Sequence, residues 1–443
     1  MSRCTARGRT MGRTPPTVRS PRLVQGVEFA VLRRRAMHTW TSRRGRVFAI
    51  DVPFFGRSVV VSDPAVVRSI CAADPQRLVN VRPNMSNLFG SGSIFALDGA
   101  AHHERRRVLA PALRGHRLAA CEQIIERETL RECATWPDGV EFATLRPMSR
   151  ITLNVILRIV FGDAPDEIAA LRRLVPPFMR LGQVLAFAPA PPPWIRGCTP
   201  WRRLDAFRAD FDRIVTTLVD KARADPRCAE RTDILSLLLR CGRCEGLAAL
   251  SDELLTLIGA GYETTAAALA WTFERLRRHP DVLADLVREV DDGGAALRRA
   301  AVFEVLRSRT VLDVAGRRVE GPTIDLGGWQ VSRHRTVLIR IADLHEDPEN
   351  FTDPGAFDPH RFLGVKPAAP TWLAFGGGTR RCLGADFAIT EMDVVLRTVL
   401  RHVRIHTDDA ADEKSRFHGV TNAPKRGGRI VVDHRTEPSW PPT

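Results

Sequence analysis

Apolar residues recur along most of this chain with the spacing of an α-helix. From about residue 64 to about residue 310 they fall three or four positions apart, the spacing that lines one face of a helix. The pattern therefore predicts a long series of amphipathic helices. The predicted helices cover residues 22–39, 101–133, 147–161, 165–183, 202–224, 231–241, 251–279 and 282–308, with a last one over 382–401.

Alternating patterns, which are typical of β-strands, lie on either side of this helical region. RVFAIDVPFF and RSVVVSD, within residues 46–63, carry the β-branched and aromatic residues of a hairpin. Short alternating segments return over 311–342 and again over 402–434. The sequence thus predicts a mainly α fold with small β-sheets, in which a large helical body is joined by a minor β-rich region.

The segment 251–276 is apolar on nearly every side, which predicts a helix through the middle of the protein. Near its middle, Ala260 and Gly261 give this helix little side-chain volume. The polar residues Glu263 and Thr264 follow directly in the next turn. A glycine inside a helix costs about 1 kcal/mol relative to alanine, so something needs the space. The alternative is a tight crossing with another helix, in which the threonine bonds back to a carbonyl one turn earlier.

The length of 443 residues would allow several domains, but no long linker or repeat interrupts the interior. We expect a flexible basic segment over 1–20 and a single domain over 21–443. No apolar stretch follows the first arginines, so we expect no secretory signal and a cytoplasmic protein. No run of 18 uncharged apolar residues occurs, so we expect no transmembrane span.

The formal net charge is +15 and comes almost wholly from arginine. Such an excess suits a nucleic acid, an anionic membrane surface or an acidic protein. The arginines have no interleaved aromatic residues for base stacking, which argues against a nucleic-acid partner. Local clusters occur at Arg33–Arg35 and Arg105–Arg107.

We expect the nine cysteines to be reduced thiols, most of them buried. Cys241 and Cys244 have the spacing of a redox or zinc site, but only Cys228 lies nearby as a further ligand. Their role stays open.

Cys382 differs from the other cysteines because it stands at the start of a predicted helix, within FGGGTRRCLG at 375–384. The helix dipole and the charges of Arg380 and Arg381 favour its thiolate. The glycines at 376–378 leave the preceding loop without side chains, so a flat ligand can lie against the backbone. From these features alone the loop could equally be a phosphate cradle or an ordinary turn.

The whole stretch fits the pattern F-x-x-G-x-R-x-C-x-G, with Phe375, Gly378, Arg380, Cys382 and Gly384 at its fixed positions. On this pattern the chain resembles the cytochrome P450 family, of the bacterial heme-thiolate monooxygenase type. Further segments resemble the same family in the same order, from about residue 15 to about residue 430. They are AAHHERRR with His103 and Arg107, AGYETT with Ala260, Gly261, Glu263 and Thr264, FEVLR with Glu304 and Arg307, and FDPHRF with Arg361.

The resemblance implies a heme b cofactor with the Cys382 thiolate as the axial ligand of its iron, a ligand whose electron donation favours O–O cleavage. It places the heme propionates against Arg380, His103, Arg107 and Arg318, and dioxygen in the space at Ala260 and Gly261. His103 and Arg107 could otherwise be an ordinary wet basic face.

The resemblance also implies that Glu263 and Thr264 relay protons to the bound oxygen. It makes Glu304, Arg307 and Arg361 a buried ion network that supports the cysteine loop. By spacing alone, Glu304 and Arg307 would be an exposed helix pair of small energetic value.

The implied activity is the insertion of one oxygen atom into a lipophilic small molecule. No flavin-binding or ferredoxin-like segment is found, so we expect a separate ferredoxin or reductase as electron donor, steered by arginines near Cys382. The alternatives are a heme-thiolate peroxygenase or isomerase, and a heme-binding protein without turnover. The segment 184–195, VLAFAPAPPPWI, could touch a membrane surface or be an ordinary proline-rich loop.

Overall fold

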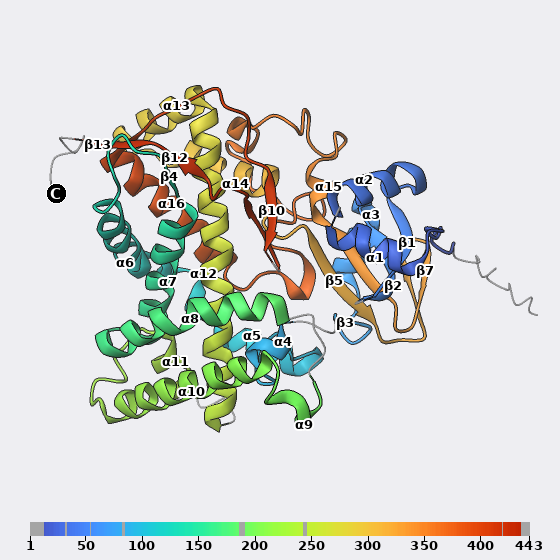
Figure 1. The fold of residues 1–443 in the computed structure, drawn as a ribbon, viewed down its shortest axis with the longest axis horizontal. Helices are drawn as coiled ribbons and strands as arrows, with labels where there is room; N and C mark the ends of the chain where they lie inside the picture. Colours follow the sequence, from blue (N-terminus) through green and yellow to red (C-terminus); the bar gives the residue numbers. More distant parts are fainter. Residues whose placement is uncertain are drawn as a thin grey trace, which may run out of the picture. The chain divides into compact units, whose positions relative to one another are not determined.

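The computed structural model describes residues 13–31, 33–53, 55–81, 85–185, 191–241, 246–418 and 420–435. Figure 1 labels the helices and strands in chain order. They form two compact units, one made of Met1–Arg82 with Val314–Leu344 and the other of Pro83–Asp313 with His345–Thr443. The first contains most of the strands, and the second contains most of the helices.

The first unit is built on a five-stranded sheet in the order β1-β2-β8-β5-β3. β2 and β8 run parallel, whereas the other neighbours are antiparallel. Helices pack on the sheet around Met37, Phe48 and Val60, which are fully buried. The elements are α1 (Arg22–Val31), α2 (Arg33–Arg44), β1 (Val47–Val52), β2 (Gly56–Val61), α3 (Pro64–Ala72), β3 (Leu78–Asn80), β5 (Val314–Val319), β6 (Thr323–Leu326), β7 (Trp329–Ser332), β8 (Thr336–Arg340) and the start of α15 (Ile341–His345).

Part of the N-terminal segment expected to be flexible is instead paired with strands. The Arg13 amide donates to the carbonyl of Gly328 at 3.0 Å, and the Val18 amide donates to that of Ala49 at 2.9 Å. The prolines at 15 and 16 hold the backbone extended, a conformation that can pair at a strand edge without any periodic sequence signal. Residues 1–12 lie outside the described part of the chain.

The second unit consists mainly of helices around α12 (Gly246–Arg278), which runs through it from end to end (Figure 1). Nearly all residues of α12 from Leu250 to Arg277 are buried, as the apolar pattern predicts. The other helices are α4 (Ser86–Phe89), α5 (Gly99–Leu109), η1 (Ala110–Leu113), α6 (His116–Cys133), α7 (Leu145–Phe161), α8 (Pro165–Leu185), α9 (Pro193–Arg196), α10 (Trp201–Ala224), α11 (Ile234–Cys241), α13 (Pro280–Asp291), α14 (Ala296–Ser308), η2 (Pro359–Phe362), η3 (Gly378–Arg380) and α16 (Ala385–His402).

Four pairs of short strands, each strand two to four residues long, complete the described elements. One of these pairs, β6 with β7, belongs to the first unit. Those of the second unit pair β10 (Ser415–His418) with β11 (Thr421–Pro424), β12 (Arg429–Ile430) with β4 (Phe142–Ala143), and β13 (Val432–His434) with β9 (Val403–Ile405). The mainly α fold with small sheets is therefore confirmed. Among the described helices, none combines the length and the apolar character needed to cross a bilayer.

One predicted helix is interrupted in the structure. The segment 101–133 is divided into α5, η1 and α6, because Pro111 cannot continue an α-helix and Gly115 takes a positive φ of 65°. The apolar period continues across this break, so it could not reveal it. Within the segment 22–39 the described residues form α1 and α2, on either side of residue 32, which lies outside the described part.

Candidate functional site

The loop around Cys382 takes a path that only glycine follows easily. Gly376 and Gly378 both have a φ of 66°, a region in which other residues are strained. The Cys382 amide donates to the carbonyl of Phe375 at 2.8 Å, which closes the loop on itself. A Cβ added at Gly376 or at Gly384 would meet nothing within 4 Å. The backbone on both sides of the cysteine thus borders open space.

Opposing effects act on the pKa of the Cys382 thiol. Burial among protein atoms raises its pKa and outweighs the Gly384 amide, Arg381 and Arg106, which act to lower it. The residue is nevertheless exposed. A thiol that is both desolvated and accessible faces an interior space, and a cation bound to the sulfur would be needed to remove its proton.

One turn of α12 is open in the middle of its buried length. Ala260 is exposed, whereas the ten residues before it are buried. Thr264 lies one turn later on the same face, and its hydroxyl donates to the Ala260 carbonyl at 2.8 Å. This turn therefore presents a small side chain and a hydroxyl to a space that the helix itself does not fill.

Gly261 does not contribute to that opening. A Cβ placed on it would lie 3.2 Å from Ile156 of α7. The hydroxyl of Thr152, also on α7, lies 2.9 Å from the carbonyl of Tyr262. The prediction that Gly261 leaves room for oxygen is therefore wrong. Its lack of a side chain serves the close crossing of α12 and α7, the alternative that the sequence left open.

Glu263 points toward α8 and is largely enclosed. Its two carboxylate oxygens accept hydrogen bonds from Gln183 Nε2 at 2.6 Å and from the Tyr262 hydroxyl at 3.2 Å. Burial raises the pKa of Glu263, although both donors and the charge of Arg180 oppose the rise. The acid thus stands beside Thr264 in the chain, with a raised proton affinity.

On α5 the histidine and the arginine that face inward each come one residue earlier than predicted. His103 and Arg107 are exposed, and Arg107 makes only a loose contact of 3.9 Å with Glu104. The inward residues are His102, which is 6% exposed, and Arg106. Burial lowers the pKa of Arg106, and the charge of Cys382 acts on it in the opposite direction. Arg106 therefore lies on the cysteine side.

Arg380 is held inward by the loop that precedes α5. Its guanidinium donates to the carbonyl of Leu97 at 2.6 Å and pairs with the carboxylate of Asp98. Burial lowers the pKa of Arg380, and the nearby charge of Arg106 acts in the same direction. Two guanidinium groups thus converge near the cysteine loop. Arg318 belongs to β5 of the other unit, where it pairs with Glu320, so its role stays a prediction.

Glu304, Arg307 and Arg361 come together as the sequence predicts. Both oxygens of Glu304 accept from Arg307 at 2.7 Å, and Arg361 Nε lies 3.2 Å from Glu304. Neither Glu304 nor Arg307 has an exposed side chain. Arg307 also donates to three carbonyls, those of His345, Pro354 and Ala356, between 2.9 and 3.0 Å. The network fixes the backbone of residues 345–361.

The residues at the site match one family along nearly the whole chain. The cytochrome P450 family model matches residues 32–429, a span that crosses both units. The chain belongs to the cytochrome P450 family. It is 51% identical over 427 residues to the Mycobacterium tuberculosis protein named cytochrome P450 138. The aligned region covers 96% of this chain and 97% of that protein. A second protein of that organism, named cytochrome P450 135B1, is 36% identical over 430 residues, 93% of this chain and 90% of its own length.

Solved P450 structures share the fold at low sequence identity. A retinoic acid-bound cyanobacterial CYP120A1 superposes with a TM-score of 0.82 at 20% identity, over 96% of this chain and all of that one. The heme domain of cytochrome P450DA gives 0.78, also at 20% identity, over 96% of this chain and 98% of that one. At this identity the likeness supports the fold alone.

P450 proteins bind heme, and the residues around Cys382 fit such a group. The sulfur is accessible, the flanking glycines leave the backbone bare, and Arg380 and Arg106 supply the charge that two propionates require. Of the predicted cofactor residues, Cys382, Arg380 and the glycine loop lie in this arrangement, whereas His103 and Arg107 do not.

Two buried acids near this P450 site were not predicted from the sequence. Glu253 is fully buried and accepts from the Ile94 amide at 3.1 Å and from Arg105 at 2.8 Å. Glu391 of α16 is also fully buried, and neither of its oxygens has a hydrogen bond of normal geometry. Burial raises the pKa of Glu391 well above its usual range, and the hydroxyl of Thr265 moderates the rise. From the sequence, these acids could have been recognised only by their positions, because the helical period places both on a buried face.

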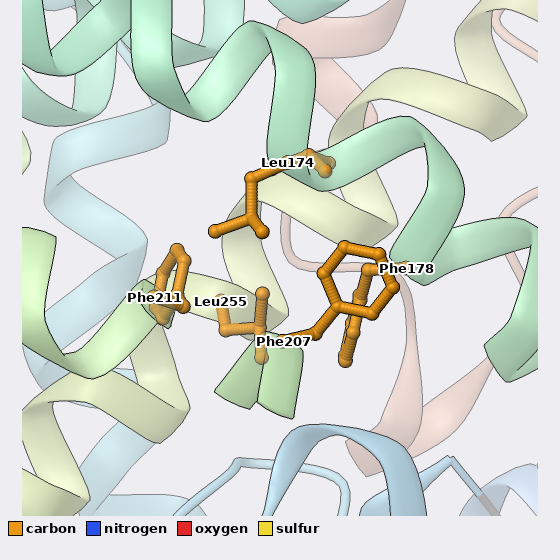
Figure 2. A pocket seen from close by; sticks show the side chains of 6 residues that line it. Leu174, Phe178, Phe207, Phe211 and Leu255 are labelled. Atoms are coloured by element: carbon orange, nitrogen blue, oxygen red, sulfur yellow. The ribbon is translucent and has the colours of Figure 1, made fainter. Parts of the chain in front are cut away.

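A small apolar pocket lies between α8, α10 and α12 (Figure 2). Its lining residues are Leu174, Val175, Phe178, Phe207, Phe211 and Leu255. It has room for about one water molecule, far less than an organic substrate needs. The pocket is therefore a packing gap in the P450 fold. Of the segment 184–195, residues 186–190 lie outside the described part, as does Cys244.

Proposed function

We propose that this P450 is a heme-thiolate monooxygenase, which activates dioxygen and inserts one oxygen atom into a lipophilic organic molecule. The observation that carries the proposal is the accessible thiol of Cys382, flanked by glycines whose backbone borders open space. The family likeness supports heme b as the cofactor. When bound, a heme with a thiolate ligand supplies the activation of dioxygen.

The chain's own residues divide the remaining tasks. Cys382 holds the iron, and Arg380 and Arg106 bind the propionates through charge-assisted hydrogen bonds. Ala260 leaves room next to the Thr264 hydroxyl, which can turn from the Ala260 carbonyl toward a ligand in that room. Glu263 supplies protons, because burial raises its pKa and so favours its protonated form. The buried faces of α12 keep water from the site.

The decisive experiment is the spectrum of the heme-loaded protein, reduced and exposed to carbon monoxide. A thiolate ligand shifts the Soret absorbance far to longer wavelength, and Cys382→Ser is expected to abolish that shift. An unshifted spectrum in the wild-type protein would refute the proposal. The substrate is then sought by titration with lipophilic compounds, in which displacement of an iron-bound water changes the spin state.

The electron donor we propose is a separate acidic protein such as a ferredoxin. Arg106, Arg114 and Arg381 lie around the cysteine loop, where Asp386 lies 3.5 Å from Arg114 and 3.9 Å from Arg381. Such a surface attracts an acidic partner at a rate that falls with ionic strength. A reduction rate that is insensitive to salt would argue against this partner.

A peroxygenase or isomerase would use the same cysteine without external electrons. We favour a monooxygenase because the polar pair at Glu263 and Thr264 is suited to delivering the protons that dioxygen activation consumes. Product formation with reductant and dioxygen, but not with peroxide alone, separates the two. A heme protein without turnover would consume no reductant in proportion to product.

A further inference from the structure

Helix α1 carries a stripe of large apolar side chains that faces away from the sheet. Leu23, Val27 and Val31, spaced one turn apart, are 76%, 61% and 73% exposed. The side that faces the sheet carries Gln25, which is 3% exposed, and Phe29. Amphipathic helices of water-soluble domains normally turn such a stripe toward the core. The outward stripe is thus an exposed hydrophobic surface that calls for a partner.

Specific hydrogen bonds fix this orientation. Gln25 Nε2 donates to the carbonyls of Ser20 and Val18 at 2.6 and 3.2 Å, and Gln25 Oε1 accepts from the Asp51 amide at 2.8 Å. On the same side Gly26 packs so closely that an added Cβ would lie 2.6 Å from Pro53. Rotating α1 to bury its valines would break these contacts, so the apolar stripe belongs to the folded protein.

The stripe lies in the most basic part of the chain. Residues 13–46 contain nine arginines and one acidic residue, Glu28. Counted from residue 1, the first 46 residues hold twelve arginines and one acid, and therefore most of the net charge of +15. Exposed arginines precede α1 at Arg19 and follow it at Arg35. Most of the net positive charge therefore lies in the part of the sequence that contains this helix.

We propose that α1 docks on the surface of an anionic phospholipid bilayer. A helix that combines an apolar stripe with flanking arginines lies in the plane of such a surface, with its apolar side chains below the phosphates. The ten residues of α1 span only about 15 Å along the helix axis, so it lies on the bilayer and does not cross it.

The same charge argues against the other occupants. A second copy of the chain would bring two strongly positive surfaces together. Residues 1–12 are themselves basic, with Arg3, Arg7 and Arg9, and contain no large apolar residues except Met1 and Met11. A nucleic acid would bind the arginines but would leave the apolar stripe in water. Compared with these occupants, anionic lipid complements both the charge and the stripe.

The test is sedimentation of the full-length protein with vesicles, either of phosphatidylcholine alone or with phosphatidylglycerol added. We expect partitioning to the mixed vesicles to be at least about tenfold stronger, and to weaken as salt rises. The triple variant Leu23→Ser, Val27→Ser, Val31→Ser should lose about tenfold in partitioning. A matched triple on exposed apolar residues of the other unit, Val140→Ser, Leu363→Ser, Val365→Ser, should bind as wild type.

Because all six positions are exposed, both triples are expected to fold, which circular dichroism and the melting temperature will check. Absence of binding to the mixed vesicles would overturn the proposal. So would equal loss in the two triples, or equal binding to neutral vesicles. A dimer in solution that the α1 triple dissociates would assign the stripe to a second copy instead, and would also overturn it.

Discussion

The Thr264 hydroxyl donates its hydrogen bond, 2.8 Å long, to the carbonyl of Ala260 on the open turn of α12. The hydroxyl thus satisfies a carbonyl of its own helix while the space beside it is free. In the proposed monooxygenase it must exchange this partner for a ligand during each turnover. The helix carbonyl provides a resting partner, so the exchange costs little.

Replacing Thr264 with alanine is therefore expected to impair proton delivery and to leave binding intact. Heme content and substrate-induced spin-state changes should match the wild-type protein. The reducing equivalents should appear largely as hydrogen peroxide, with product per reductant lower by about tenfold, because one positioned proton donor contributes at least that much. Thr264→Ser keeps the hydroxyl and should retain coupling. Unchanged coupling in Thr264→Ala would contradict the assigned role.

The two neighbouring arginines of α5 give a matched pair for testing the propionate contacts. Arg106 faces the cysteine side and Arg107 faces solvent, so only Arg106→Gln should weaken heme retention. A charge-assisted hydrogen bond contributes about 1.5–3 kcal/mol, which corresponds to at least about tenfold in heme affinity. Transfer of heme to apomyoglobin measures the loss. Equal effects of Arg106→Gln and Arg107→Gln would show that heme binding does not depend on which of the two arginines faces the cysteine side.

The sequence could not predict which histidine and which arginine of α5 face inward. His-His and Arg-Arg-Arg satisfy a four-residue spacing in two ways, His102 with Arg106 and His103 with Arg107, and both are consistent with a helix. Which pair faces inward depends on how α5 is rotated in the fold, and that is fixed by distant contacts such as the one between Arg105 and Glu253. The sequence shows both pairs, but it does not determine how the helix is rotated about its axis.

Other features were predictable because their geometry is local. Glu304 and Arg307 are three residues apart on one helix, so their contact required only that α14 form. The position of Cys382 followed from a pattern of ten consecutive residues. Gly261, in contrast, was assigned to the wrong neighbour, because a thin point on a helix does not reveal whether a ligand or another helix will use it. Ile156 of α7 uses it.

The ion network at Glu304 is expected to be essential for stability. Glu304→Gln removes one charge from a pair with no exposed side-chain surface and leaves Arg307 uncompensated, which costs about 3–5 kcal/mol. Asp285→Asn removes the acid of another pair three residues apart, with Arg288, whose side chains are 33% and 75% exposed. That change should cost less than about 1 kcal/mol. Urea unfolding of both variants measures the contrast, and similar losses would show that the network contributes no more than a surface pair.

Glu253 predicts a dependence of stability on pH. Burial raises its pKa from 4.5 to about 7, against the lowering effects of Arg105 and the Ile94 amide, while Asp252 adds to the rise. The folded protein therefore binds this proton more tightly than the unfolded chain does. The stability that results is present below the unfolded pKa of 4.5 and is lost as the pH rises through about 7.

Glu253→Gln cannot titrate, so the difference in unfolding free energy between wild type and variant isolates this group. Between about pH 4.5 and pH 8 the wild type should lose about 3 kcal/mol relative to the variant, at about 1.4 kcal/mol per pKa unit. The substitution leaves Arg105 in place, and Asp252 remains bound to Arg208 in both proteins. Urea unfolding at both ends of this pH range measures the difference. A constant difference would mean that Arg105 holds Glu253 ionised at every pH, and that the ion pair outweighs the cost of burial.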